Sequence, residues 1–198
     1  MHHAKVIRLT DAIKILGFAG SLRKESYNKA ILRAAQKLVP PNAELEIFDL
    51  EGIPLFNQDL EKQMPERVNE FKSKISAADA ILIATPEYNY SIPGVLKNAL
   101  DWASRPYPDN SFSGKPVAIM SASGGMLGGS RAQYHLRQVF VSLDMRPINR
   151  PEMIIPNVTS KLDESGRLAD EDTSEHIGKL LDALVRWTIK LQAGNNSP

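Results

Sequence analysis

The sequence contains no cysteine. A chain without thiols has no disulfide bond, no thiolate metal site and no cysteine nucleophile. It also lacks an apolar run of the roughly 20 residues that a membrane-spanning helix needs. The first residues lack the apolar core and the small-residue cleavage site of a signal peptide. We therefore expect a cytoplasmic protein that does not enter a membrane.

An excess of charge of one sign is also missing. The 198 residues include 24 Lys and Arg against 23 Asp and Glu, a net charge of +1. This balance gives no electrostatic reason to expect nucleic acid or an anionic membrane as a partner. The 42% hydrophobic content is typical of a globular protein. The length predicts a single domain over residues 1–198, with an N-terminal extension at residues 1–12 and a disordered tail at residues 194–198.

Three familiar loop motifs are absent. Without G-x-x-x-x-G-K-[ST] there is no loop for a magnesium-bound triphosphate, and without G-x-G-x-x-G there is no dinucleotide fingerprint. The strained G-x-S-x-G turn of hydrolases on α/β scaffolds is missing as well. Any phosphate site in this chain has to be built differently.

Apolar runs alternate with patterns of helical period along the chain. We expect strands at residues 14–19, 43–50, 79–85, 116–122 and within 146–155, and helices at residues 26–38, 65–76, 93–103, 130–143 and 173–191. The run at residues 79–85 is apolar without alternation, as in a parallel strand buried on both faces. Pro147 and Pro151 favour an edge position for the last strand. The pattern predicts an α/β fold, a doubly wound five-stranded parallel sheet with helices on both faces.

The first loop, GSLRKESYN at residues 20–28, has the composition of a phosphate seat. It leads into a helix N-terminus, whose unpaired N–H groups and partial positive charge favour an anion. Gly20 allows the backbone to approach the anion closely. Side chains that can donate hydrogen bonds to it are Ser21, Arg23, Ser26 and Asn28. The simpler alternative is an ordinary strand-to-helix turn in which Ser26 caps the helix.

Two further loops are expected at the same edge of the sheet, because ligands of such folds bind beyond the carboxyl ends of the strands. The sequence PEYNYS at residues 86–91 offers aromatic faces and amides, and SGG at residues 123–125 offers backbone amides with little bulk. A flat, heteroatom-rich ring fits between them, with its phosphate in the first loop.

Taken in order, these motifs resemble the NADPH-dependent FMN reductase family, which includes quinone, chromate and azo-dye reductases. Residues 20–28 match its pattern G-S-x-R-x-x-S-x-N, residues 85–102 read TPEYNYSIPGVLKNALDW, and a glycine-rich segment follows at residues 123–129. The resemblance extends over roughly residues 14–143. It implies a flavodoxin-like fold, non-covalently bound FMN, NAD(P)H as hydride donor and a homodimer or homotetramer.

Carried over by position, the resemblance assigns the FMN phosphate to the first loop and the ribityl chain and ring to the other two. The residues expected to bind the cofactor are Gly20, Ser21, Arg23, Ser26, Tyr27, Asn28, Pro86, Glu87, Tyr88, Asn89, Tyr90, Ser123, Gly124 and Gly125. We expect no metal site and no catalytic side chain, because the flavin itself carries the chemistry.

Several of these residues also have a purely structural interpretation. Tyr88 and Tyr90 can pack on neighbouring loops, and Glu87 can cap the helix that begins near residue 93 or pair with Arg105. Met126 is expected to fill a gap in the packing rather than to cover the ring.

The expected function is hydride transfer from NAD(P)H through FMN to a quinone or another small acceptor, such as an azo or nitro aromatic, chromate or a ferric complex. Both substrates would use the same flavin face, which predicts ping-pong kinetics. The alternative is a flavodoxin-type electron carrier for a protein partner. The sequence leaves open the acceptor, NADH against NADPH, and dimer against tetramer.

Overall fold

The computed structural model describes residues 12–194. The expected N-terminal extension and C-terminal tail lie outside this range, apart from one residue each. Ala12 directly precedes the first strand, and Gly194 is the last residue of the final helix rather than the start of a tail. Within residues 12–194, no helix combines the length and the apolar character needed to cross a membrane.

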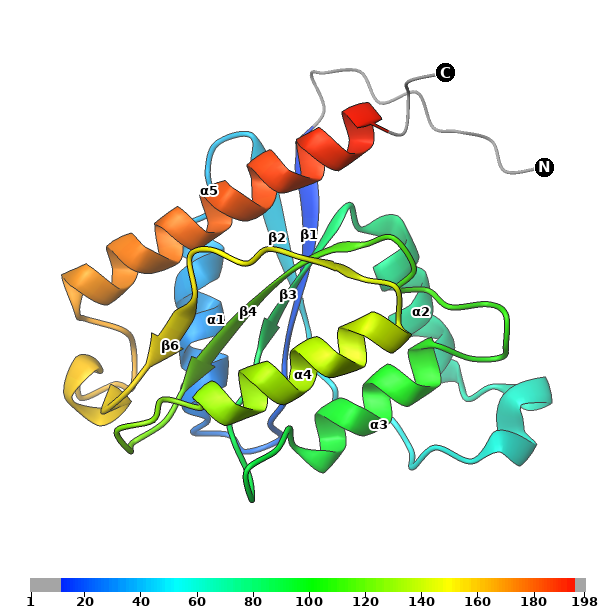
Figure 1. The fold of residues 1–198 in the computed structure, drawn as a ribbon. Helices are drawn as coiled ribbons and strands as arrows, with labels where there is room; N and C mark the ends of the chain where they lie inside the picture. The colour runs from blue at the N-terminus through cyan, green and yellow to red at the C-terminus, as the bar shows by residue number, and fades with distance from the viewer. Residues whose placement is uncertain (1–11, 195–198) are drawn as a thin grey trace.

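The strands form one parallel sheet in the order β2-β1-β3-β4-β5, with β6 also paired to β4 (Figure 1). This is the strand order of the flavodoxin-like fold, which confirms the expected class. The strands are β1 Ile13–Ala19, β2 Ala43–Phe48, β3 Ala80–Ala84, β4 Pro116–Ala122, β5 Arg146–Pro147 and β6 Met153–Ile155. The helices are α1 Tyr27–Lys37, α2 Glu66–Ala77, α3 Gly94–Ala103, α4 Ser130–Ser142 and α5 Glu171–Gly194, with short 3₁₀ helices η1 Gln58–Gln63 and η2 Val158–Lys161.

The expected last strand is divided in two. Arg146 and Pro147 pair with the beginning of β4, and residues 153–155 pair with its end. The chain leaves the ladder in between, where Pro151 has no N–H group to donate. The edge position predicted from the two prolines is confirmed, and the fifth place in the sheet is shared by β5 and β6.

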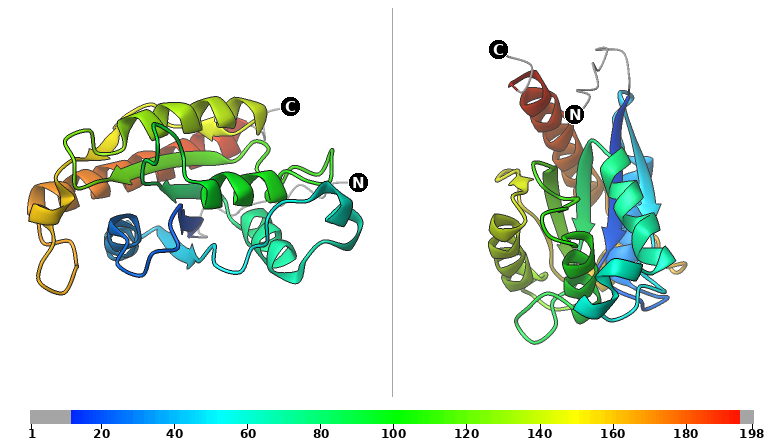
Figure 2. Two further views of the ribbon diagram at one scale, coloured as in Figure 1. Left: turned by 90° about the horizontal axis from the view of Figure 1, so that it is seen from below. Right: turned by 90° about the vertical axis from the view of Figure 1, so that its right-hand side faces the viewer.

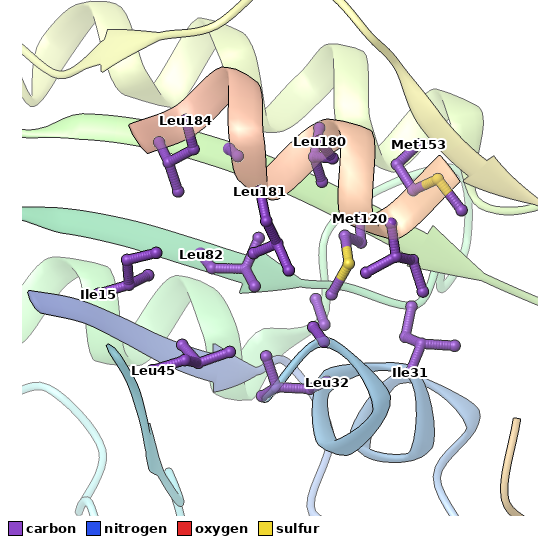
Figure 3. Packing of buried hydrophobic residues seen from close by; sticks show 14 of the residues in the cluster. Ile15, Ile31, Leu32, Leu45, Leu82, Met120, Met153, Leu180, Leu181 and Leu184 are labelled. Carbon is purple, nitrogen blue, oxygen red and sulfur yellow. The ribbon is translucent and has the colours of Figure 1, made fainter. Parts of the chain in front are cut away.

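The sheet is covered on both faces because its central strands alternate between two cores. On β3, Leu82 packs on the side of α1 and α5, while Ile81 and Ile83 pack on the side of α2, α3 and α4. Figure 3 shows the first of these cores, where Leu181 of α5 and Leu32 of α1 point into the same cluster on one face of the sheet. All five residues of β3 are buried, as its unbroken apolar run predicts.

The reversal of strand order positions the candidate site. From β1 the chain passes through α1 to β2, and from β2 it crosses back through α2 to β3 on the other side of β1. The loops after β1 and β3 therefore diverge at the point where ligands of this fold class bind. These loops and the one after β4 lie at the bottom of Figure 1, and the left panel of Figure 2 looks onto this edge.

Two glycines fix where α4 begins. Gly128 and Gly129 have φ angles of 57° and 88°, a region that side chains disfavour. A Cβ atom on Gly128 would lie 2.6 Å from Ile154 Cγ2, and one on Gly129 would lie 2.8 Å from Ser121 Cβ. The start of α4 is thus packed directly onto β4 and β6.

Replacing Gly128 by alanine is expected to lower the free energy of unfolding by roughly 1–3 kcal/mol, through the disfavoured φ and the crowding against Ile154. Urea denaturation of the purified variant measures this change. Gly178→Ala is the matched control, because nothing lies within 4 Å of its Cβ position in α5. That substitution should raise stability by about 0.5–1 kcal/mol; a destabilisation of equal size in both variants would contradict the packing argument.

Candidate functional site

The loops after β1, β3 and β4 together line a cleft of about 180 Å³. The lining residues are Ser21, Arg23, Ser26, Tyr27, Asn28, Pro86, Glu87, Tyr88, Ala122, Ser123 and Gly124. Most of the residues expected to bind the cofactor therefore converge, while Gly20, Asn89, Tyr90 and Gly125 lie outside this lining and Ala122 is an addition. Pockets that enclose a drug-sized ligand measure roughly 300–1,000 Å³. A nucleotide seated in this cleft would thus keep part of itself in the open.

The first loop combines a helix cap with a seat for an anion. Ser26 is the N-cap of α1, and its Oγ accepts a hydrogen bond from the Lys29 N–H at 3.3 Å. Ser21 Oγ accepts from the Arg23 N–H at the same distance. Because both oxygens act as acceptors, each hydroxyl keeps its hydrogen to donate to an anion. Ser26 can therefore cap the helix and still donate a hydrogen bond to a phosphate, so the two interpretations of this loop are compatible.

The electrostatics of the first loop favour negative charge. The first turn of α1 carries no acidic residue, so its unpaired N–H groups keep their partial positive charge. The Arg23 guanidinium lies 5.1 Å from the centre of the Tyr27 ring, and both residues line the cleft. Buried hydroxyls, a helix N-terminus and a guanidinium are groups that favour a phosphate, and the assignment of the FMN phosphate to this loop stays a prediction.

Asn28 ties the first loop to the third. Its amide nitrogen donates to the Ala122 carbonyl at 2.9 Å, and its amide oxygen accepts from the Ala122 N–H at 3.0 Å. The side chain is only 2% exposed, and this pair of bonds satisfies the last backbone groups of β4. The structure therefore shows Asn28 as a link between α1 and β4, and contact with a phosphate stays a prediction.

Gly20 serves packing between elements. A Cβ atom at this position would lie 3.1 Å from Leu96 Cβ on α3 and 3.4 Å from Thr85 Oγ1. The missing side chain thus allows the end of β1 to approach α3. Close approach of the backbone to an anion, which we expected of this glycine, stays a prediction.

The second loop is a tight turn. The N–H and carbonyl groups of Tyr88 and Ser91 bond reciprocally at 3.0 Å, and between them Asn89 and Tyr90 have φ angles of 51° and 67°. Tyr88 lines the cleft and is 53% exposed. Asn89 and Tyr90 form the tip of the turn, and Tyr90 is 72% exposed.

Glu87 points at α4. Its carboxylate accepts from the backbone N–H groups of Arg131 and Ala132 at 3.0 and 3.3 Å, and it pairs with the Arg131 guanidinium. The N-cap of α4 is Gly129, which has no side chain to accept these bonds. Both structural interpretations of Glu87 were therefore wrong about the partner. Glu87 caps α4 rather than the helix that begins near residue 93, and it pairs with Arg131 rather than with Arg105. The hydrogen bond to Glu87 raises the pKa of Arg131 above its ordinary value.

The third loop is pinned to the end of the sheet. Ser123 Oγ accepts from the Gly125 N–H at 3.2 Å, and the Ser123 carbonyl accepts from Val158 at 3.0 Å. Gly124 faces the cleft, with its nearest neighbour 3.9 Å from the Cβ position. Met126 is 85% exposed, so the expectation that it fills a gap was wrong. Its side chain stands in solvent on the loop that borders the cleft.

Comparison with known proteins agrees with the geometry of the cleft. Residues 13–160 match the family described as NADPH-dependent FMN reductase. The chain belongs to this family. The chain is also 52% identical over 185 residues to an NAD(P)H-dependent FMN reductase of Pseudomonas aeruginosa, covering 93% of this chain and 100% of that protein.

Two further relatives extend the comparison. A 2-hydroxy-1,4-benzoquinone reductase of Burkholderia is 44% identical over 176 residues, covering 89% of this chain and 96% of its own. The solved structure of FerB, an NAD(P)H:(acceptor) oxidoreductase flavoenzyme from Paracoccus denitrificans, superposes with a TM-score of 0.84 at 36% identity. It covers 90% of this chain and 98% of the FerB chain.

As an NADPH-dependent FMN reductase, the chain is an enzyme that uses FMN and a reduced nicotinamide, and the electron-carrier alternative is set aside. The cleft suits FMN, because it joins a seat for one phosphate to a half-open space beside Tyr88 and Gly124. Within residues 12–194, no three His, Asp or Glu side chains gather as a metal site.

Sequence reasoning missed Arg131, which lies 44 residues from its partner Glu87 with no motif to connect them.

Asn28→Ala tests the link between α1 and β4. The substitution leaves the buried N–H and carbonyl of Ala122 unpaired, which should lower the free energy of unfolding by about 1–3 kcal/mol for each group that water does not reach. Urea denaturation of the flavin-free protein isolates this effect from cofactor binding. Asn69→Ala is the control, because its amide bond to the Met64 carbonyl is exposed. Equal stabilities of the two variants would show that the bond pair is dispensable.

Proposed function

We propose that this enzyme passes hydride from NAD(P)H to a quinone, with bound FMN between them. The observation that carries the proposal is the convergence of three loops on one cleft, whose lining includes the Ser21 and Ser26 hydroxyls and Arg23. Quinone reduction is named for the Burkholderia relative, and an exposed flavin could also reach azo and nitro aromatics, chromate or ferric complexes. The choice between NADH and NADPH stays open.

The division of labour follows from the lining residues. Ser21, Arg23 and Ser26 would hold the FMN phosphate, while the backbone of residues 86–88 and Ser123–Gly124 would flank the ribityl chain and the ring. FMN supplies the hydride-accepting ring, so the chain needs no nucleophile, acid or base of its own. Of the histidines in the described range, His135 contacts Ser91 Oγ and His176 contacts the Asp172 carbonyl.

The open side of the cleft defines where substrates approach. Tyr88 is half-exposed beside it, and Met126 and Leu127 are 85% and 51% exposed on the third loop. Such aromatic and thioether groups suit a flat, apolar ring system better than a charged one. We propose that the nicotinamide and the quinone use this side in turn.

We further propose that the enzyme works in the cytoplasm as a homodimer or homotetramer. Support for assembly comes from exposed apolar side chains such as Tyr134 and Val141, which are 56% and 83% exposed on α4.

Arg23→Ala should weaken FMN binding without unfolding the chain. A charge-assisted hydrogen bond contributes roughly 1.5–3 kcal/mol, so the Kd should rise by about 10- to 100-fold. Quenching of flavin fluorescence on titration of the flavin-free protein measures the Kd. Arg33→Ala provides the control, because this exposed arginine of α1 does not line the cleft. An unchanged Kd in Arg23→Ala would remove this residue from the phosphate seat.

Alternate use of one open side predicts ping-pong kinetics. Initial rates measured against NADPH at several fixed benzoquinone concentrations should give parallel double-reciprocal lines, since the nicotinamide leaves before the quinone enters. Intersecting lines would indicate that both substrates are bound together and would contradict a shared binding position.

A further inference from the structure

The second loop is held in a conformation that its own residues disfavour. Asn89 and Tyr90 both have left-handed backbone angles, which asparagine tolerates and a bulky aromatic residue rarely adopts. Two reciprocal hydrogen bonds between Tyr88 and Ser91 close the turn. Because residues in such conformations persist only when their surroundings fix them, the contacts made by this loop decide its shape.

Those contacts come from one face of α4. Glu87 binds the N-terminal N–H groups of the helix, Tyr90 lies under the Arg131 side chain, and Ser91 Oγ is 2.8 Å from His135 Nδ1. Arg131 and His135 are four residues apart, so their side chains share one side of the helix. The loop is thus docked on α4 at its beginning, its tip and its end.

Arg131 contacts two parts of the loop at once. Its guanidinium pairs with the Glu87 carboxylate and lies 3.7 Å from the centre of the Tyr90 ring. The Glu87 side chain is only 8% exposed, whereas that of Arg131 is 38% exposed. Among residues 12–194, no second cationic side chain forms an ion pair with Glu87. Apart from the two helix N–H groups, the buried carboxylate therefore has one charged partner, and that guanidinium also covers Tyr90.

The same helix carries the third loop. Residues 123–129 lead directly into α4, which Gln133 fastens to the sheet through bonds to Ser121 Oγ at 2.8 Å and the Met153 carbonyl at 2.7 Å. A displacement of the start of α4 would therefore shift both loops. Arg131 itself does not line the cleft, so any effect it has on a ligand passes through Glu87 and Tyr90.

We propose that Arg131 is a positioning residue for FMN, which holds the second loop in its binding shape and couples it to the third loop through α4. The role requires arginine, because only a planar guanidinium can pair with a carboxylate and stack on an aromatic ring together. This inference rests on the proposed FMN site.

The test compares four variants with the wild-type protein: Arg131→Met, Arg131→Lys, Glu87→Gln and the double variant Glu87→Gln/Arg131→Met. Arg137→Met is the matched control, because Arg137 also lies on α4 but contacts Asn149 and the Ile148 carbonyl instead. Two quantities are measured: the Kd for FMN by flavin fluorescence, and hydrogen exchange of the Tyr88 and Ser91 amides in flavin-free protein.

Arg131→Met should raise the Kd for FMN by roughly 3- to 30-fold, the range for residues that act through a neighbour, and should speed exchange of the two amides. Arg131→Lys should recover little of either, since lysine keeps the charge but not the planar fork. The double variant should bind FMN more tightly than Arg131→Met alone, because glutamine leaves no unpaired buried charge. Arg137→Met should match the wild type in both measurements.

A Kd and an exchange rate in Arg131→Met equal to those of Arg137→Met would overturn the inference, as would full recovery in Arg131→Lys. A double variant that binds FMN no better than Arg131→Met would overturn the route through Glu87. Failure of the wild-type protein to bind FMN would refute the proposed function instead. The exchange measurement in flavin-free protein would still test whether Arg131 holds the second loop in its conformation.

Discussion

The candidate site depends on a sheet whose strands all run in the same direction between two covered faces. Burial of β3 and β4 on both faces confines their open loops to the ends of the strands, and the loops at the carboxyl ends of β1, β3 and β4 line the cleft. The reversal of strand order beside β1 then separates two neighbouring loops and creates the space between them. The cleft is therefore a product of topology, and the loop sequences determine what it binds.

Side chains that the motifs assign to the cofactor tie the loops to the rest of the fold. Asn28 fastens the first loop to the end of β4, and Glu87 fastens the second loop to the start of α4. Side chains that a motif assigns to a cofactor can thus be committed to the scaffold, where they hold the backbone that lines the cleft. A site built this way is largely preformed before the flavin arrives, which reduces the ordering cost of binding.

The sequence was sufficient for the parts of the fold that repeat a local pattern. Unbroken apolar runs and helical periods predicted the five long helices and the first four strands to within a few residues, and Pro147 and Pro151 indicated the edge position of the last strand but not its division into β5 and β6. The Ser26 cap of α1 was also predictable, because a serine directly before a helical pattern is a local signal, whereas the phosphate site in the same loop stays a prediction. The exposure of Met126 could not be predicted, because a glycine-rich loop has no regular hydrophobic pattern that would show which way one apolar side chain faces. The Glu87–Arg131 pair joins positions far apart in the chain, so only the folded structure brings it to light.

The divided fifth strand has a consequence for how copies of the chain can associate. A continuous edge strand presents a row of free N–H and carbonyl groups on which another sheet can extend. Here Pro147 lacks the donor, the ladder is interrupted over residues 149–152 after the Ile148 N–H bonds to the Val117 carbonyl, and Arg150 projects a charged side chain at the break. These features disfavour edge-to-edge growth of the sheet on this side, and with it aggregation by strand addition.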